Sequence, residues 1–191
     1  MEDAELLLAE PGAPPAERDE ELALAARTDP DAFGILYRRH RLSVFRYLRT
    51  RTASDDDAAE LTAVAFERAL AAIPRYRSVG GGIVAWLLRI ARNAAIDAGR
   101  RTSALALPAE LADGRPRATP EDALLGAEAR AALIAAVELL PDMQREAIVL
   151  RYAAGLTARE IAEVLGKREA ATQKLLSRAL ATIREAYRAD A

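Results

Sequence analysis

The chain has 191 residues, a formal net charge of −2, one histidine (His40) and no cysteine. This composition argues against a disulfide framework, a cysteine zinc site, a thiol nucleophile and a bound cofactor, and glycines 80–82 fit no nucleotide-binding motif, so we expect no enzyme. No apolar run approaches the ~20 residues of a membrane span and the acidic start is unlike a signal peptide, so we expect a cytoplasmic protein.

The N-terminal part of the chain indicates a tail followed by helices. Residues 1–18 are acidic and contain three prolines and a glycine, which predicts a mobile tail without a fixed fold. From residue 20 to residue 48, apolar residues recur at spacings of three and four, which is typical of helices rather than strands. Ser54, followed by three aspartates, predicts the start of another helix, which Pro74 should end.

A loop and a further long helix follow. In the helix that starts at these aspartates, Phe66, Leu70 and Ile73 form one apolar stripe, which predicts a core contact. Residues 74–82, PRYRSVGGG, combine a helix breaker with three glycines and predict a loop. Residues 83–101 then return to helical periodicity.

The second half of the chain predicts a linker and a second helical domain. Residues 102–119 contain prolines and a glycine without sustained periodicity, which is typical of a flexible linker. Helices are expected at about 121–139, 142–153, 158–165 and 169–187, separated by Pro141, Gly155 and Gly166. We therefore expect an all-α protein with two helical domains, residues 19–101 and 120–191.

The C-terminal segment TAREIAEVLGKREAATQKLL has the spacing of a helix-turn-helix motif. Small Ala162 stands where two helices would cross, and Gly166 falls in the turn. Thr157 and Glu160 form a T-x-x-E capping box, which predicts where the first helix starts. In the second helix, Thr172 is expected on the buried face, with its hydroxyl bonded to a backbone carbonyl one turn earlier.

The outward face of that second helix is polar and supplies candidate DNA-reading residues. These are Arg168, Glu169, Gln173, Lys174, Ser177 and Arg178. The alternative is a helical protein-interaction module whose outer face is only solvated.

Charge is unevenly distributed along the chain. Residues 1–32 contain ten acidic and two basic residues, a formal charge of −8, whereas residues 33–101 carry +7. A local basic surface can bind nucleic acid even when the whole chain is slightly acidic, although these arginines could also simply solvate helix surfaces. Two roles are open for the acidic start: shielding the basic block in the free protein, or solubility alone.

Two upstream segments and one downstream segment together resemble a known family. AELTAVAFERALAAIPRYRSVGGG and IVAWLLRIARNAAIDAGRR resemble region 2 of bacterial RNA polymerase sigma factors. LPDMQREAIVLRYAAGLTAREIAEVLGKREAATQKLLSRALATIRE resembles region 4 of the same proteins. The order of the segments, with a linker between them and no region-three domain, resembles the extracytoplasmic-function (ECF) group of the sigma-70 family over roughly residues 20–187.

The resemblance implies partners and a docking surface. A sigma factor binds the RNA polymerase core through the β′ clamp helices and the β flap, recognises promoter DNA and typically has an anti-sigma factor. The implied clamp-docking residues are Glu60, Leu61, Ala63, Val64, Glu67 and Arg68. At Ala63 and Val64 the family often has a polar and an acidic residue.

The resemblance also implies that region 2 captures the proximal (−10) promoter element and that region 4 reads the distal (−35) element. The implied −10 residues are Arg75, Tyr76, Arg77, Ser78, Arg89, Arg92, Asn93, Asp97, Arg100 and Arg101. Arginines beside an aromatic residue and a glycine loop suit a strand whose bases have left the stack. Ile83 and Val84 stand where the family commonly has an aromatic residue and an arginine.

Structural roles compete with some of these assignments. Asn93 and Asp97 could instead stabilise their helix or hydrogen-bond to a neighbouring helix, and Trp86 is expected in the core rather than as a stacking platform. The 18-residue linker reaches at most ~65 Å, close to the ~70 Å between elements two helical turns apart. Two other classes stay open: a helix-turn-helix regulator that binds DNA without polymerase, and a helical adaptor that binds only protein.

Overall fold

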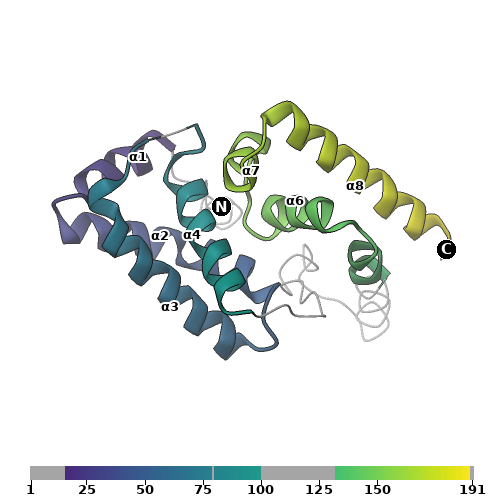
Figure 1. The fold of residues 1–191 in the computed structure, drawn as a ribbon, viewed down its shortest axis with the longest axis horizontal. Coiled ribbons are helices and arrows are strands. Elements are labelled where there is room, and N and C mark those ends of the chain that lie inside the picture. The colour runs from purple at the N-terminus through teal and green to yellow at the C-terminus, as the bar shows by residue number, and fades with distance from the viewer. Residues whose placement is uncertain (1–15, 79, 100–131, 190–191) are drawn as a thin grey trace, which may run out of the picture.

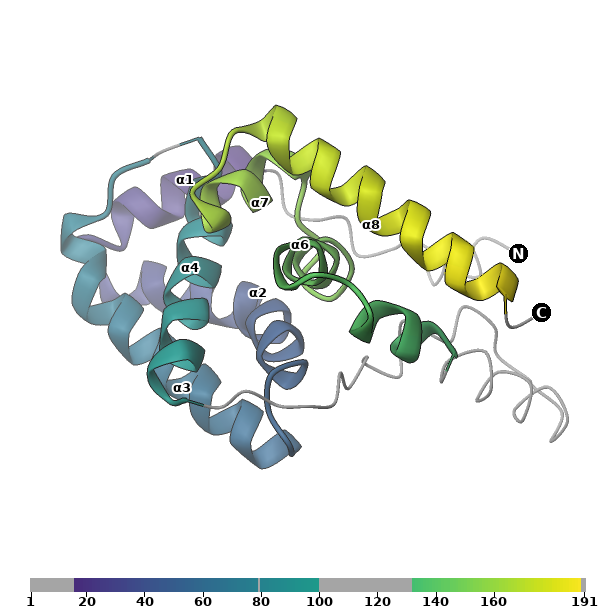
Figure 2. The same ribbon diagram turned by 45° about the vertical axis from the view of Figure 1, so that its right-hand side comes forward.

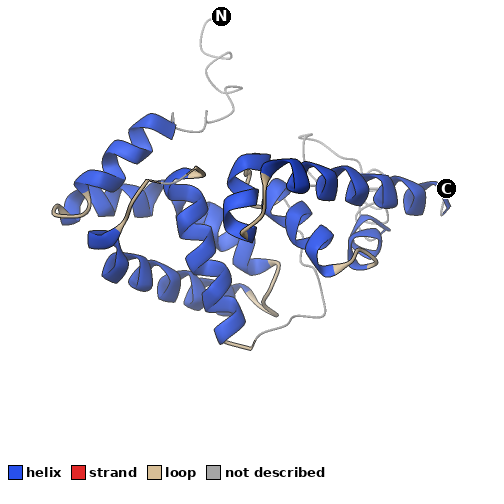
Figure 3. Ribbon diagram, turned by 45° about the horizontal axis from the view of Figure 1, so that its top comes forward, coloured by secondary structure: helices blue, strands red, loops and turns tan. Residues whose placement is uncertain are grey.

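The fold is known from a computed structural model, which describes residues 16–78, 80–99 and 132–189. Within these ranges the regular structure is helical throughout and includes no strand (Figure 3). The prediction of an all-α protein with two helical domains is therefore confirmed. The acidic tail predicted at 1–18 falls almost entirely outside the described residues, and the linker predicted at 102–119 falls outside them altogether.

The N-terminal domain contains four α-helices and one 3₁₀ turn, which Figure 1 shows from purple to teal. Their bounds are α1 (Ala16–Ala25), α2 (Pro30–Arg49), α3 (Asp55–Ala72), η1 (Ile73–Arg75) and α4 (Gly82–Asp97). The cap predicted for α3 is present, since the Ser54 hydroxyl accepts a hydrogen bond from the Asp57 amide at 3.1 Å. The expected helix over 83–101 ends earlier, at Asp97, and the chain turns at Gly99, whose φ is +63°.

Aromatic packing holds α2 against α3. Phe66 of α3 is 5 % exposed and meets the rings of Phe33 and Tyr37 edge-on, at centroid distances of 6.4 and 4.8 Å. Ile73 is buried as predicted, but Leu70 is 50 % exposed, so the predicted stripe was wrong at that position. The reason is that the buried face of α3 is continued by small Ala69 at 0 % exposure, which lets the helix approach its neighbours closely.

The C-terminal domain is built from short helices and the long C-terminal helix α8. Residues 132–138 are helical, and they are followed by α6 (Asp142–Tyr152), α7 (Ala158–Leu165) and α8 (Glu169–Ala189). These bounds lie within one or two residues of the predicted ones, apart from the first helix, whose expected beginning lies outside the described residues. In Figure 1, α8 runs away from the N-terminal domain to the C-terminus.

The two domains are packed against each other. The contact is made by α7 on α4 and by α6, which faces the C-terminal end of α2 and the middle of α4, as Figure 2 shows. Buried apolar residues form one continuous cluster through both domains. We call this arrangement, in which the two domains are in contact, the closed form. In it, α4 lies between the other helices of its own domain and the C-terminal helices.

Candidate nucleic-acid interface

The helix-turn-helix predicted from the sequence is present in α7 and α8. The Thr157 hydroxyl accepts from the Glu160 amide at 3.3 Å, and Glu160 Oε2 accepts from the Thr157 amide at 2.7 Å, which completes the capping box. Gly166 ends α7 in the left-handed region, with φ +63° and ψ +37°, a conformation that a side chain would oppose. The turn is therefore fixed by these residues, and α8 starts three residues later.

Thr172 sets which face of α8 is buried. It is 0 % exposed, and its hydroxyl donates to the Arg168 carbonyl at 3.3 Å, as predicted. Ala179, two turns further on, is also fully buried. These two contacts turn the opposite face of the helix outward.

All six candidate DNA-reading residues, one directly before α8 and five within it, are exposed. They are Arg168, Glu169, Gln173, Lys174, Ser177 and Arg178. The Gln173 amide donates to Glu169 at 3.3 Å, so these two side chains hold each other along the helix. The exposure of the whole set is what base reading in a major groove requires.

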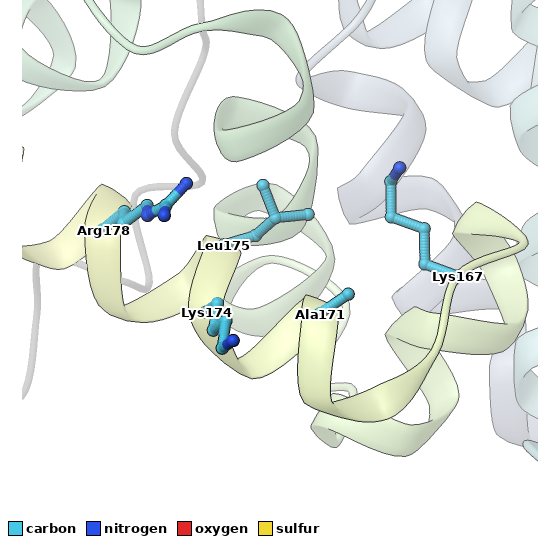
Figure 4. Close-up of a pocket in the computed structure, with 5 residues that line it drawn as sticks. All are labelled: Lys167, Ala171, Lys174, Leu175 and Arg178. Atoms are coloured by element: carbon cyan, nitrogen blue, oxygen red, sulfur yellow. The ribbon is translucent and has the colours of Figure 1, made fainter.

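A shallow hollow lies along this face of α8. Its volume is about 250 Å³, and it is lined by Lys167, Ala171, Lys174, Leu175 and Arg178. Figure 4 shows the three basic side chains around the apolar floor of Ala171 and Leu175. Three cations around an apolar patch suit a DNA backbone, because phosphates bind to basic side chains without regard to sequence.

Two of the candidate −10 residues on α4 form ion pairs with the C-terminal domain. Arg89 Nη1 lies 3.5 Å from Glu163 of α7, and Arg92 Nε lies 3.5 Å from Glu146 of α6. Asn93 is exposed. Two of the −10 candidates therefore contact carboxylates of the C-terminal domain.

Asp97 and Arg68 had been assigned to different surfaces, DNA and polymerase. The structure brings them together as an exposed ion pair between α4 and α3, with 2.6 Å between Arg68 Nη1 and Asp97 Oδ2. Exposed pairs of this kind contribute little to stability. The alternative that Asp97 contacts a neighbouring helix rather than DNA thus has a defined partner in Arg68. Arg100 and Arg101 lie outside the described residues.

The loop after α3 presents its arginines but not its aromatic ring. Arg75, Arg77 and Ser78 are exposed, whereas Tyr76 is 2 % exposed. The Tyr76 hydroxyl donates to Glu20 Oε1 at 2.7 Å, and burial together with Glu20 raises the pKa of this phenol. An unpaired base could stack on Tyr76 only after the ring had left this position, which corrects the expectation of an available aromatic platform.

Trp86 and Ile83 belong to the packing of α4. Trp86 is partly buried against the core and meets Tyr76 edge-on at 5.2 Å between ring centroids, as expected for a core residue. Ile83 is 2 % exposed. These side chains fix the start of α4 after the glycine loop.

The implied clamp-docking surface on α3 is divided. Glu60, Ala63, Glu67 and Arg68 are exposed and Val64 is partly exposed. Leu61 is 5 % exposed and packs in the core, so its part in docking could only be to hold the helix in place. The exposed members lie on successive turns of one helix, where a partner helix could pack.

Sequence reasoning missed the role of Glu146. This carboxylate is 8 % exposed, and it contacts Tyr47, Arg51 and Arg92 of the other domain. Its only sequence signal is an acidic residue directly before the apolar run AIVL, on the buried side of α6. The partners are 54 to 99 positions away, so no local pattern could reveal them.

These features define a two-domain helical protein with a helix-turn-helix whose second helix has an exposed face with basic side chains. Residues 36–104 match the family described as Sigma-70 region 2, and residues 130–183 match Sigma-70, region 4. The chain belongs to the sigma-70 family, and within it to the ECF RNA polymerase sigma factors.

Named relatives support the same group. The ECF sigma factor BldN of Streptomyces coelicolor is 36% identical over 158 residues, which cover 81% of this chain and 60% of BldN. SigD of Mycobacterium tuberculosis, also an ECF sigma factor, is 32% identical over 177 residues, 87% of this chain and 82% of SigD. This chain thus spans less than two thirds of BldN and most of SigD.

A solved structure has a similar fold. CnrH in complex with the cytosolic domain of CnrY matches with a TM-score of 0.64 and 26% identity, over 91% of this chain and 99% of that one. The likeness extends across both domains. Among the described residues, no helix is both long enough and apolar enough to cross a membrane.

Proposed function

We propose that this protein binds RNA polymerase core in the cytoplasm and directs promoter-specific initiation. Region 4, residues 120–191, would read the distal element through α8, and region 2, residues 19–101, would trap unpaired bases of the proximal element along α4. Residues 102–119 would link them. The polymerase supplies the bond chemistry, so the role proposed for this chain is binding without catalysis.

The observation that carries the proposal is the outward basic face of α8 in a helix-turn-helix whose first helix is capped at both ends. Lys174 and Arg178 are exposed beside the hollow described above. If one of these side chains binds a phosphate, its removal should weaken binding to all DNA sequences and reduce the salt dependence of the affinity. If it binds a base, its removal should cost ~1 to 3 kcal/mol of binding free energy.

The partners follow from family membership. The exposed residues of α3 are the proposed docking site for the β′ clamp helices, and region 4 is proposed to meet the β flap. Because the CnrH structure contains the cytosolic domain of CnrY, we also propose that this factor is held by an anti-sigma protein.

Reconstituted holoenzyme on genomic DNA tests the function. Transcript start sites should share two upstream elements, and footprints should cover both. Lys174→Ala and Arg178→Ala should each reduce initiation from promoters that depend on the distal element. Arg184→Ala is the matched control, because Arg184 is exposed further along the same helix and outside the reading set.

Three outcomes would contradict the proposal. Normal initiation by both α8 variants would exclude the groove assignment. DNA binding without any complex with core polymerase would favour a regulator that acts alone. Failure to bind DNA in either state would favour a protein-binding adaptor.

A further inference from the structure

The contact between the two domains contains a buried carboxylate, Glu146 of α6. The Tyr47 hydroxyl donates to its Oε1 at 2.8 Å, Arg51 pairs with its Oε2, and Arg92 Nε lies 3.5 Å from Oε1. Glu146 itself is 8 % exposed. A carboxylate is stable in such a place only when charged or hydrogen-bonding partners replace its water. Here all three partners come from region 2.

On the region-2 side of this cluster, Tyr47 and Arg51 pack against each other. In this closed form Tyr47 is 0 % exposed, and burial raises the pKa of its phenol, so the hydroxyl is protonated at neutral pH and can donate a hydrogen bond. The Arg51 guanidinium lies 4.9 Å from the centroid of the Tyr47 ring, a cation–π distance. Region 2 therefore offers a phenol and two guanidinium groups that together fit one anionic group.

A second contact closes the other end of α4. Glu163 of α7 lies 3.5 Å from Arg89, and its Cβ would be 2.9 Å from a Cβ placed on Gly81. Because that approach depends on the missing side chain, α7 rests directly on the glycine loop. The two carboxylates of region 4 thus meet the two arginines of α4, and the loop between α3 and α4 is covered at Gly81.

This closed arrangement is incompatible with simultaneous reading of two promoter elements. Elements two helical turns apart lie ~70 Å from each other, whereas α7 and α4 are in direct contact here. An arginine bound to a carboxylate must also release it before it can bind a phosphate. Initiation therefore requires that the contact at Glu146 and Glu163 open.

We propose that Glu146 locks region 4 onto region 2 in the free factor, so that region-4 carboxylates occupy the arginines of α4 in place of promoter phosphates. The proposal rests on the proposed function, because it takes Arg89 and Arg92 to be DNA contacts. Core polymerase would favour the open form by binding both regions in separate places. The tail is not needed for this form of inhibition, since the blocking charges belong to α6 and α7.

The opening can be measured directly on the full chain. The sequence has no cysteine, so Ala71→Cys on α3 and Ala181→Cys on α8, both exposed, give two unique sites for spin labels. Double electron–electron resonance then reports the distance between the domains. Glu146→Gln should shift the distance distribution to longer values.

Two further variants make the test specific. Asp142→Asn is the matched control, because it removes the same charge from the same helix at a side chain that is 94% exposed, and it should leave the distances unchanged. Arg51→Gln removes the ion pair with Glu146 from the region-2 side, and it should lengthen the distances between the domains as Glu146→Gln does. If Glu146→Gln fails to fold in thermal denaturation, Arg51→Gln decides the matter.

The affinity of the free factor for DNA shows whether the closed form is inhibitory. Free factor is titrated with a forked duplex whose proximal element is single-stranded. If the closed form is about 90 % populated, opening raises the apparent affinity about tenfold, because the apparent Kd varies inversely with the competent fraction. Arg51→Gln should show the gain even though it removes a positive charge, which a simple charge effect could not produce.

Each negative result has a distinct meaning. Unchanged distances in folded Glu146→Gln and Arg51→Gln would overturn the lock. Longer distances with unchanged DNA affinity would overturn the claim that the contact inhibits. Failure of the wild-type holoenzyme to initiate at any promoter would contradict the proposed function, while the distance measurement would still decide whether Glu146 holds the domains together.

Discussion

At the scale of single residues, Phe66 connects two helices of region 2 through aromatic contacts. It is 5 % exposed and touches Phe33 and Tyr37. Phe66→Ala should lower the free energy of unfolding by about 3–5 kcal/mol, because it removes a core ring and leaves a cavity. Chemical denaturation followed by circular dichroism measures the change. Leu70→Ala, at a half-exposed position one turn later, is the control and should cost much less; equal midpoints would contradict this packing.

His40 makes the stability of region 2 depend on pH. It is 6 % exposed, Asp19 Oδ2 lies 3.0 Å from its Nε2, and Arg39 is its neighbour. Burial is the largest influence and lowers the pKa of His40 despite the attraction of Asp19. The pKa of His40 is thus lower in the folded protein than in the unfolded chain, where it has its usual value of about 6.5. The stability it contributes is present above pH ~6.5 and is lost as pH falls below that value.

The measurement is the melting temperature between pH 7.5 and 5. His40→Gln cannot titrate in this range, so its melting temperature should fall less steeply with acid than that of the wild type. Parallel curves would show that the acid sensitivity comes from other groups.

At the scale of elements, local signals determine most of what the sequence could predict. Capping at Ser54 and Thr157 and the turn at Gly166 depend on neighbouring residues, and all three are present where predicted. The early end of α4 and the exposure of Leu70 depend on packing between helices, which periodicity alone does not specify. The outward face of α8 was predicted for the same local reason: Thr172 and Ala179 follow the helical repeat.

The candidate site was predicted less completely than the helices. Tyr76 has an aromatic ring on which a base could stack, but its hydroxyl donates a hydrogen bond to Glu20, 56 positions away, and the ring is buried. For Glu146 the one local signal, its place before the apolar run AIVL, does not reveal its partners, because they belong to another domain. Distant partners of this kind decide which polar side chains remain exposed, and the identity of these partners depends on the tertiary arrangement.

At the scale of the whole molecule, two sources of negative charge can act on the basic face of region 2. Glu146 and Glu163 do so through contacts, and the negative charge of residues 1–18 would add a longer-range attraction, which salt screens over ~8 to 10 Å. Removal of residues 1–18 eliminates five acidic residues and one arginine. We predict that it raises the DNA affinity of free factor chiefly at low salt.

The two effects can be separated by combining the changes. The buried Glu146 contact is screened less than exposed charges, so the gain from Glu146→Gln should persist at higher salt while the gain from tail removal disappears. In the doubly altered protein the gains should multiply at low salt, because independent free energies add. Equal affinities of full-length and truncated protein at low salt would leave solubility as the tail's role, and the carboxylates of α6 and α7 would then be the inhibitory charges.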